Sequence, residues 1–506
     1  MSQREKNEKF IFVAFAVVVG FIVHGSYIFD KQIWHDDACS LMGITPVYSL
    51  GQGHWMRAII NTIVDKIIGN EQIIILHAII VFICIGLIAV TLFQKLNIIN
   101  NFSRIVIIIY MVSNIAVLSN MGYADCLAVN FITLYILTVA IILMFEGIMH
   151  INILKIMIGM LTLICSLAVY QCYFAYYISL LLVLYFDYIL SNDSEQISYY
   201  WKKGILMIFI SIVCLGIYIV SVELSVRLVG IKLSSYAATD TYGVVSFFEY
   251  VTRVKYAYYQ FFIQEANHPY SFFPIKWIGW WKMLLIIFVV SFVIIGRRFF
   301  IKKEYSKIIT MVFLLVCFPL AQNLIFVMYG QEVSHGLHTF HSIYTIVLLV
   351  IISEYASKIC SKYLTYSVLC LILVLNGLLI KYDNICYTSI KAANEKSINY
   401  VTVLISDIHN VEGYEEGMHI YMVNTSKFIE KGLDNSVFSN EIVTDPYNAS
   451  TLYYTANEFI KYHIYDNFFV RDLEISEYEK YDIENMPIYP SANSIKVVDN
   501  KVIVKF

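Results

Sequence analysis

The chain has 506 residues, of which 59% are hydrophobic and only 14% are charged, and its formal net charge is −3. Soluble globular proteins carry about 25% charged residues. Aromatic side chains, here 16% of the chain, are common where membrane helices meet water. The composition excludes an ordinary soluble protein, shows no basic surface for nucleic acid, and indicates a membrane protein with many spans.

Apolar runs long enough to cross a bilayer recur along the first part of the chain. A transmembrane helix needs about 20 mostly apolar residues. On that basis the sequence predicts about eleven helices, at residues 10–28, 72–93, 104–119, 126–146, 152–169, 173–190, 204–222, 278–296, 308–329, 340–357 and 363–380. Only Tyr170, Gln171 and Cys172 separate the fifth run from the sixth, so the helix count there stays open.

Lysine and arginine collect in alternate loops, and short loops rich in these residues lie on the cytoplasmic side of a membrane. With the N-terminus inside, the cytoplasmic loops include RRFFIKKEYSK at 297–307. The short outer connections at 119–125, 170–172 and 329–338 contain neither residue type. An odd number of spans then places the C-terminal region outside the cytoplasm.

Residues 1–380 are therefore expected to form an all-α polytopic transmembrane domain. Two of its outer connections are long: 29–71 and 223–277. The first contains MRAIINTIVDKII, whose helical spacing suits a helix lying along the membrane interface. The second is rich in aromatic residues.

Beyond residue 380 the composition becomes that of an ordinary soluble protein, so residues 381–506 are expected to form a small extracytoplasmic α/β domain. Two pieces with alternating apolar residues, 418–424 and 495–506, predict strands. The second piece is expected to form a hairpin that turns at Asp499 and Asn500.

The most polar part of the first outer loop is WHDDACSLMGITPVYSLGQGHWMR, residues 34–57, which follows the first apolar run directly. Its adjacent carboxylates, Asp36 and Asp37, lie close to the membrane boundary, where a lower dielectric constant raises the free energy of ionising two neighbouring groups. A solvated loop is the simplest interpretation of this pair. A carboxylate here can also deprotonate a sugar hydroxyl, while nearby cations hold the displaced phosphate. The candidate cations in this stretch are His35, His54 and Arg57.

Other outer connections supply further candidate residues. Asp125 is either a carboxylate of the same cavity or the N-cap of the next helix. Gln171, after Tyr170, marks either a turn or a substrate contact. His338 is spaced three residues from His335 and from His341, and this spacing places the three rings on one helical face.

No metal site is predicted. The histidine spacing, with Glu332 nearby, matches none of the zinc patterns, so histidines lining a polar cavity are favoured over a metal or phosphate site. A divalent magnesium or manganese ion stays open as a cofactor, and no other cofactor is indicated. Glycine-rich nucleotide loops are absent from the sequence, which argues against a soluble nucleotide-sugar donor.

Four segments resemble the Gtr-type bacterial glucosyltransferases, the O-antigen serotype-conversion enzymes within the C-type glycosyltransferase superfamily. WHDDACSLMG…GHWMRAIINTI is similar to the family's first-loop pattern of an Asp-Asp pair followed by an Arg. MGYADCLAVNFITLYIL resembles its second-loop Asp before a span. SLAVYQCYFAYYISLLLV resembles its Tyr-Gln membrane segment, and ENMPIYPSANSIKVVDNKVIVKF resembles its Met-Pro and strand-pair ending.

The resemblance implies a catalytic pair, Asp36 and Asp37, with Arg57 on the donor phosphate and Asp125 in the cavity. It also implies a sugar donor carried on polyprenyl (undecaprenyl) phosphate and a cell-surface polysaccharide or teichoic-acid-like acceptor outside the bacterial plasma membrane. A small flippase and a polyprenyl-phosphate glycosyltransferase are implied partners, with membrane lipids around the spans. The chain departs from the family pattern at Ser40 and Met56, where the family often has Arg and Gly.

These observations predict a membrane glycosyltransferase that inverts the anomeric centre with an aspartate as general base. The expected sugar is glucose. Two alternatives from other classes stay open: a transporter or flippase of lipid-linked oligosaccharide, and a non-catalytic scaffold of envelope assembly. A flippase shares the high number of spans. It does not readily account for the outer domain or for carboxylates in an outer loop instead of mid-span.

Overall fold

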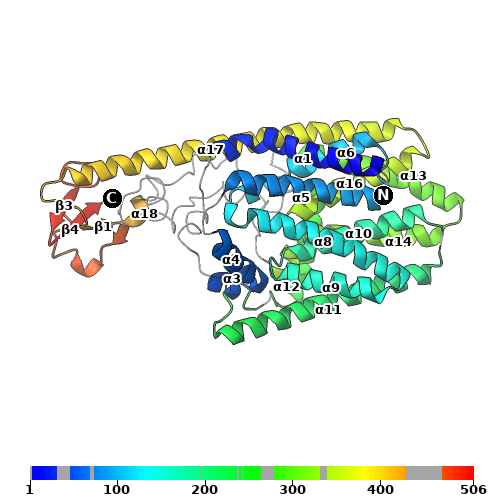
Figure 1. Cartoon of the computed structure of the whole chain (residues 1–506), viewed down its shortest axis with the longest axis horizontal. Coiled ribbons are helices and arrows are strands. Elements are labelled where there is room, and N and C mark those ends of the chain that lie inside the picture. The colour runs from blue at the N-terminus through cyan, green and yellow to red at the C-terminus, as the bar shows by residue number, and fades with distance from the viewer. Residues whose placement is uncertain are drawn as a thin grey trace. The chain divides into compact units, whose positions relative to one another are not determined.

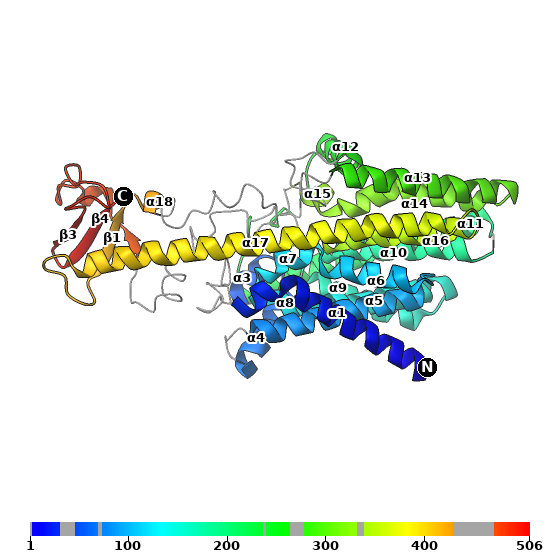
Figure 2. The same cartoon turned by 90° about the horizontal axis from the view of Figure 1, so that it is seen from above.

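The computed structural model describes residues 3–30, 46–68, 73–193, 195–235, 239–241, 243–263, 278–330, 339–428 and 470–506. The chain divides into two compact units (Figures 1 and 2). The membrane unit comprises the described residues of Met1–Ile28 and Thr45–Asp383. The C-terminal unit comprises those of Phe29–Ile44 and Asn384–Phe506.

Helices make up the membrane unit. They are α1 (Gln3–Asp30), α3 (Pro46–Gly51), α4 (Trp55–Ile68), α5 (Ile74–Lys95), α6 (Asn101–Val112), α7 (Ile115–Met121), α8 (Ala124–His150), α9 (Ile153–Leu167), α10 (Tyr173–Ser191), α11 (Ile197–Val229), α12 (Phe247–Ile263), α13 (Ile278–Ile301), α14 (Tyr305–Gln322), α15 (Leu324–Tyr329), α16 (Ile343–Ser357) and α17 (Tyr363–His409). Within the described residues, ten helices are long and apolar enough to cross a membrane, with α6 and α7 together forming one of them. The protein is therefore a multi-pass membrane protein.

The sequence predicts about eleven spans, and the structure differs at two of them. The predicted span 152–169 is helix α9, which has 15 residues, fewer than the ~20 that cross a bilayer. The predicted span 363–380 is the start of α17, which continues without a break to His409. No proline or glycine interrupts residues 381–409, so the change to a soluble composition does not end the helix.

Burial separates inner helices from outer ones. In the most apolar window of Phe340–Ser357, which contains α16, 83% of the residues are buried, compared with 22% in Gly279–Ile301 of α13. Helix α10 packs against α8, α14 and α16, and α8 also packs against α5 and α9. Since aliphatic side chains remain exposed along α13 and α11, these two helices present apolar surface to the lipid.

The two ends of the membrane unit differ in chemistry. We call one the basic end; there Glu146 accepts from Lys95 at 2.7 Å and from Lys155 at 2.6 Å. Lys203 and Lys307 at the same end donate to backbone carbonyls. We call the opposite end the site end, formed by residues 51–57, 120–123, 168–173 and 340–342. Helices α3 and α4 lie at this end (Figure 1).

The C-terminal unit contains a four-stranded sheet with the order β2 (Val470–Asp472), β1 (His419–Val423), β4 (Lys501–Lys505), β3 (Ile495–Val498). Strand β1 runs parallel to both neighbours, whereas β3 and β4 pair antiparallel. The predicted strand at 418–424 and the predicted hairpin at 495–506 are both confirmed. Asp499 and Asn500 have φ values of 52° and 59°, as a two-residue type I′ turn requires.

The last part of α17 and the end of α1 belong to this second unit. Tyr489 donates to the Asp407 carboxylate at 2.8 Å, and the Tyr400 ring packs on Phe428 and Tyr489. Asp30 of α1 pairs with Lys391 of α17 at 2.6 Å. The contacts of Asp407 and Tyr400 join the end of α17 to segments next to the sheet, and the Asp30–Lys391 pair joins α17 to the end of α1.

Candidate active site

Helix α4, which begins at Trp55, is held by a contact between two helix ends. Helix α9 ends at the C-cap Ala168, and the Ala168 carbonyl accepts from the backbone N–H groups of Met56 and Arg57 at 3.1 and 3.3 Å. The first N–H groups of a helix and the last carbonyls of a helix have no partners within their own helix. Here α4 supplies the donors and α9 the acceptor, so the contact fixes the position of Arg57.

The residue before α4 makes a long-range hydrogen bond at the site end. His54 Nε2 lies 2.7 Å from Gln171 Oε1, although 117 positions separate the two residues. The amide nitrogen of Gln171 donates to the Gln52 carbonyl at 2.7 Å. Gln171 therefore binds both sides of the turn at Gly53, and the structure brings together two of the predicted site residues.

The turn at Gly53 requires glycine. Its φ is +82°, and a Cβ atom there would lie 3.2 Å from Gln171 Nε2 and 3.2 Å from Tyr218 Oη. A side chain at this φ is strained, and the close approach of both polar atoms leaves little room. Tyr218 also donates to the Gly53 carbonyl at 3.3 Å. The turn is thus held both by the connection between α9 and α10 and by α11.

His54 is neutral at physiological pH. The side chain is buried, and both the burial and the nearby positive charge of Arg57 lower the pKa of His54 from 6.5 to about 4, against a smaller opposing effect of the Gln171 hydrogen bond. An imidazole with this pKa carries no charge at pH 7. His54 is consequently not the cationic partner that the sequence suggests, while half-buried Arg57 keeps its charge.

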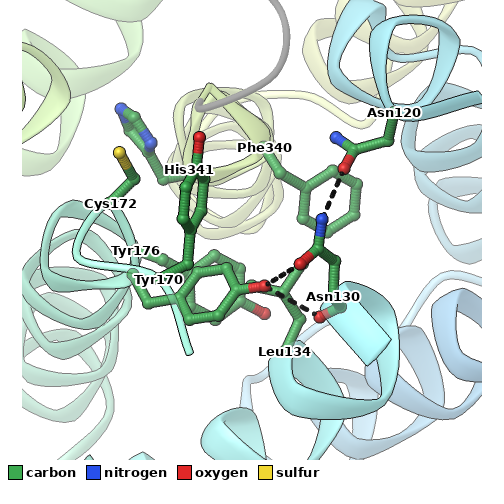
Figure 3. A pocket seen from close by; sticks show the side chains of 9 residues that line it. Asn120, Asn130, Leu134, Tyr170, Cys172, Tyr176, Phe340 and His341 are labelled. Atoms are coloured by element: carbon green, nitrogen blue, oxygen red, sulfur yellow. Dashed lines mark hydrogen bonds between the residues drawn. The ribbon is translucent and has the colours of Figure 1, made fainter. Parts of the chain in front are cut away.

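A small pocket lies next to this pair (Figure 3). Tyr170 links the two, because its ring is 5.3 Å from the His54 ring, centroid to centroid, and also lines the pocket. The pocket has room for water but not for a sugar. The lining residues are Asn120, Asn130, Leu134, Tyr170, Cys172, Tyr173, Tyr176, Phe340 and His341.

Buried amides form the polar wall of this pocket. The Tyr173 hydroxyl donates to the backbone and side-chain oxygens of Asn130, at 3.1 and 3.2 Å. Asn130 donates to Asn120 at 3.0 Å, and Asn120 donates to the Ala116 carbonyl at 2.7 Å. These hydrogen bonds fix the orientation of the Asn120 and Asn130 amides, and side chains that recognise hydroxyl groups need such a fixed orientation.

Several predicted site residues lie outside the described part of the chain: Asp36, Asp37, His35 and His338, together with Glu332 and His335. Asp125 is the second residue of α8, whose N-cap is Tyr123. The interpretation of Asp125 as that N-cap is wrong, since an Asp needs to precede the helix to cap it.

Of the three histidines predicted to share a helical face, His341 alone lies within the described residues. It lies in a short 3₁₀ segment, Phe340–Ser342, and its Nε2 donates to the Gln322 carbonyl at 2.8 Å. Among the described residues, no group of three or more His, Cys, Asp or Glu side chains is arranged to hold a metal ion.

The sequence was compared with models of known protein families. The model of the family described as "Glucosyl transferase GtrII" matches residues 25–352, more than half of the 506 residues. The chain belongs to the GtrII glucosyl transferase family. Searches of curated proteins and of solved structures give no match.

Membership of the GtrII family, together with the spans, makes the protein a membrane glycosyltransferase. The residues that match the family model include the whole His54–Gln171 contact, Arg57 and the pocket. The C-terminal unit from Asn384 onward lies beyond the match.

Sequence reasoning missed the pocket residues Asn120, Asn130 and Tyr173, as well as Tyr218. One signal was present: Asn130 is a polar residue within an apolar run, and polar residues inside membrane segments often serve function. Tyr218 carried no such signal, since tyrosine is common throughout this chain.

Proposed function

We propose that this GtrII family protein transfers glucose from polyprenyl phosphate to a cell-surface glycan at the outer face of the bacterial plasma membrane. The observation that carries the proposal is the anchored start of α4. It places the positive charge of Arg57 beside a neutral, hydrogen-bonded His54 at the end of the membrane unit opposite the basic end. A lipid-linked phosphate is held at the same level of a membrane, where the spans end.

The asymmetric distribution of basic residues supports the orientation. Basic residues favour the cytoplasmic side, so the basic end is assigned to the cytoplasm and the site end to the outer face. The N-terminus is then cytoplasmic and the C-terminal unit extracytoplasmic. In this orientation the predicted catalytic loop and Arg57 both face the compartment in which surface glycans are completed.

The proposed reaction is an inverting displacement at the anomeric carbon of the donor. One of Asp36 and Asp37 accepts the proton of the acceptor hydroxyl, whose oxygen forms the new bond to the anomeric carbon. The bond between that carbon and the phosphate oxygen breaks, and the polyprenyl phosphate leaves with the electron pair. Arg57 stabilises the departing phosphate. Superfamily analogy favours Asp36 as the base, with Asp37 orienting the acceptor.

The remaining partners follow from this reaction. The aromatic segment 223–277 is proposed to cover bound sugar, and the C-terminal unit to bind the acceptor, a polysaccharide or a teichoic-acid-like polymer. A polyprenyl-phosphate glycosyltransferase and a small flippase would make and deliver the donor. A divalent cation is not required by the proposed roles of these side chains.

The test measures transfer from purified polyprenyl-phosphate glucose by the purified protein and by the variants Asp36→Asn and Asp37→Asn. The variant that removes the base is expected to lose about 10²- to 10⁴-fold in kcat. Asp193→Asn, an exposed position at the basic end, is the matched control and should keep full activity. Full activity in both loop variants would overturn the mechanism, and absence of transfer by the wild type would overturn the function.

A second measurement names the sugar and the acceptor. The composition of the surface glycan is compared between cells with and without the protein. Loss of a glucose branch supports the proposal. An unchanged branch pattern with a loss of whole polymer from the surface would favour a flippase instead.

A further inference from the structure

The hydrogen bonds of Gln171 determine which nitrogen of His54 carries the proton. The Gln52 carbonyl can only accept, so the Gln171 group 2.7 Å from it is the amide NH₂. The oxygen of the same amide therefore faces His54 Nε2 at 2.7 Å. Because an amide oxygen also only accepts, Nε2 must be the N–H of the imidazole.

The other ring nitrogen is then a bare acceptor. His54 is neutral, and a neutral imidazole has a single N–H, which Gln171 binds. The Nδ1 atom is buried, and the described residues offer it no hydrogen-bond partner. The side chain as a whole is only 5% exposed, so bulk water does not readily satisfy this atom. A buried acceptor without a partner is unfavourable.

The chemistry of Nδ1 selects the kind of ligand group that can bind it. A lone pair accepts from O–H or N–H groups and repels anionic oxygens. A sugar phosphodiester at pH 7 carries no hydrogen on its phosphate, whereas each sugar unit carries several hydroxyl groups. The adjacent Tyr170 ring, 5.3 Å from the imidazole, adds an apolar face of the kind on which sugar rings pack.

We propose that His54 Nδ1 accepts a hydrogen bond from a hydroxyl group of a bound sugar, with Gln171 acting as the positioning residue that holds the required tautomer. The identification of the ligand as a sugar rests on the proposed function. The roles at the site end then divide by charge: Arg57 binds the phosphate and His54 binds the sugar. This assignment replaces the expected role of His54 as a phosphate-binding cation.

The test uses two substitutions that each keep one side of the imidazole. His54→Gln places an amide near the Nε2 position, where it can still donate to Gln171, and removes the Nδ1 acceptor. His54→Asn places an amide near the Nδ1 position and cannot reach Gln171. His150→Gln, an exposed position at the basic end, is the control. KM and kcat are measured for donor and acceptor with each protein.

For His54→Gln, we expect the KM of the substrate that supplies the hydroxyl to rise about tenfold, because one neutral hydrogen bond is lost. Donors that each lack one glucose hydroxyl then locate the group. If the donor supplies the hydroxyl, one monodeoxy donor should have a KM about tenfold higher than that of polyprenyl-phosphate glucose. This difference is expected for the wild type and for His54→Asn, but not for His54→Gln. A raised KM for the acceptor alone assigns the hydroxyl to the acceptor.

Two outcomes overturn the inference while leaving the proposed function intact. One is a His54→Gln variant with both KM values within twofold of the wild type. The other is a variant whose kcat falls while both KM values stay unchanged, as a purely structural role predicts. Failure of the proposed function is distinct, because then the wild type itself transfers no glucose. If His54→Gln fails to fold, the wild type and His54→Asn must both lose about tenfold with one monodeoxy substrate, donor or acceptor, or the inference is wrong.

Discussion

The two ends of the membrane unit bind their polar groups in different ways. At the basic end, full charges meet one another or meet backbone carbonyls, as in the bridge from Glu146 to Lys95 and Lys155 and in the contact of Lys203 with the end of α8. At the site end, the described contacts are mostly between neutral groups: a histidine, a glutamine, two asparagines and tyrosines.

This difference separates anchoring from recognition. Partly exposed ion pairs contribute little to stability, and basic residues at one end favour one orientation in the membrane. At the site end, a buried and uncharged imidazole, held in one direction by an amide, lies beside the positive charge of Arg57. Substitutions at the two ends should therefore have different effects.

The largest expected effect is at Arg57. Replacement by Ala should lower kcat/KM about 10- to 100-fold, because a hydrogen bond to a charged group contributes about 1.5–3 kcal/mol. Replacement by Lys keeps the charge and should recover part of the loss. Kinetics with the lipid-linked donor measure both. Arg227→Ala is the control, since Arg227 is 79% exposed and pairs with Glu223. Equal activity of Arg57→Ala and the control would contradict the assignment.

Gln171→Leu should reduce both stability and activity. The substitution leaves the Gln52 carbonyl and His54 Nε2 without the partner seen in the structure, and a buried polar group left unpaired costs about 1–3 kcal/mol. Thermal unfolding in detergent measures the loss. Gln196→Leu, an exposed position at the basic end, provides the comparison. An unchanged melting temperature would show that the turn at Gly53 does not depend on this amide.

The pH dependence of stability follows from His54. Its pKa is about 4 when folded, below the value of 6.5 outside the fold, so between these values the unfolded state binds the extra proton. Stability is therefore fully present above pH 6.5 and falls as the pH drops toward 4. Between pH 7 and pH 5 the wild type should lose about 2 kcal/mol more than His54→Gln. Parallel pH profiles for the two proteins would refute this.

Glu146→Gln at the basic end should have the smallest effect. Its carboxylate and the two lysines are 27–40% exposed, and pairs of this kind contribute about 0.2–1 kcal/mol. We expect a slightly lower melting temperature, a difference that shrinks at high salt, and unchanged transfer activity. A loss of activity as large as that of Arg57→Ala would remove the distinction between the two ends.

Local patterns were sufficient for much of the fold. Apolar runs indicated most of the spans, and the helical spacing of residues 56–68 is realised in α4. The alternation of apolar and polar residues on both sides of Asp499 and Asn500 correctly predicted the hairpin of β3 and β4. Length was less well indicated: α9 is shorter and α17 much longer than the apolar runs suggest, because helix ends depend on capping and packing as well as hydropathy.

The candidate site also has features that the sequence predicted and features that only the structure shows. The sequence by itself indicated a polytopic glycosyltransferase-like chain and selected His54, Arg57 and Gln171 as residues of interest. Only the tertiary structure paired His54 with Gln171, placed the α4 N-terminus on Ala168, and made the histidine neutral. The physical reason is that protonation and hydrogen-bond direction depend on burial and on partners more than a hundred residues away, which no local pattern contains.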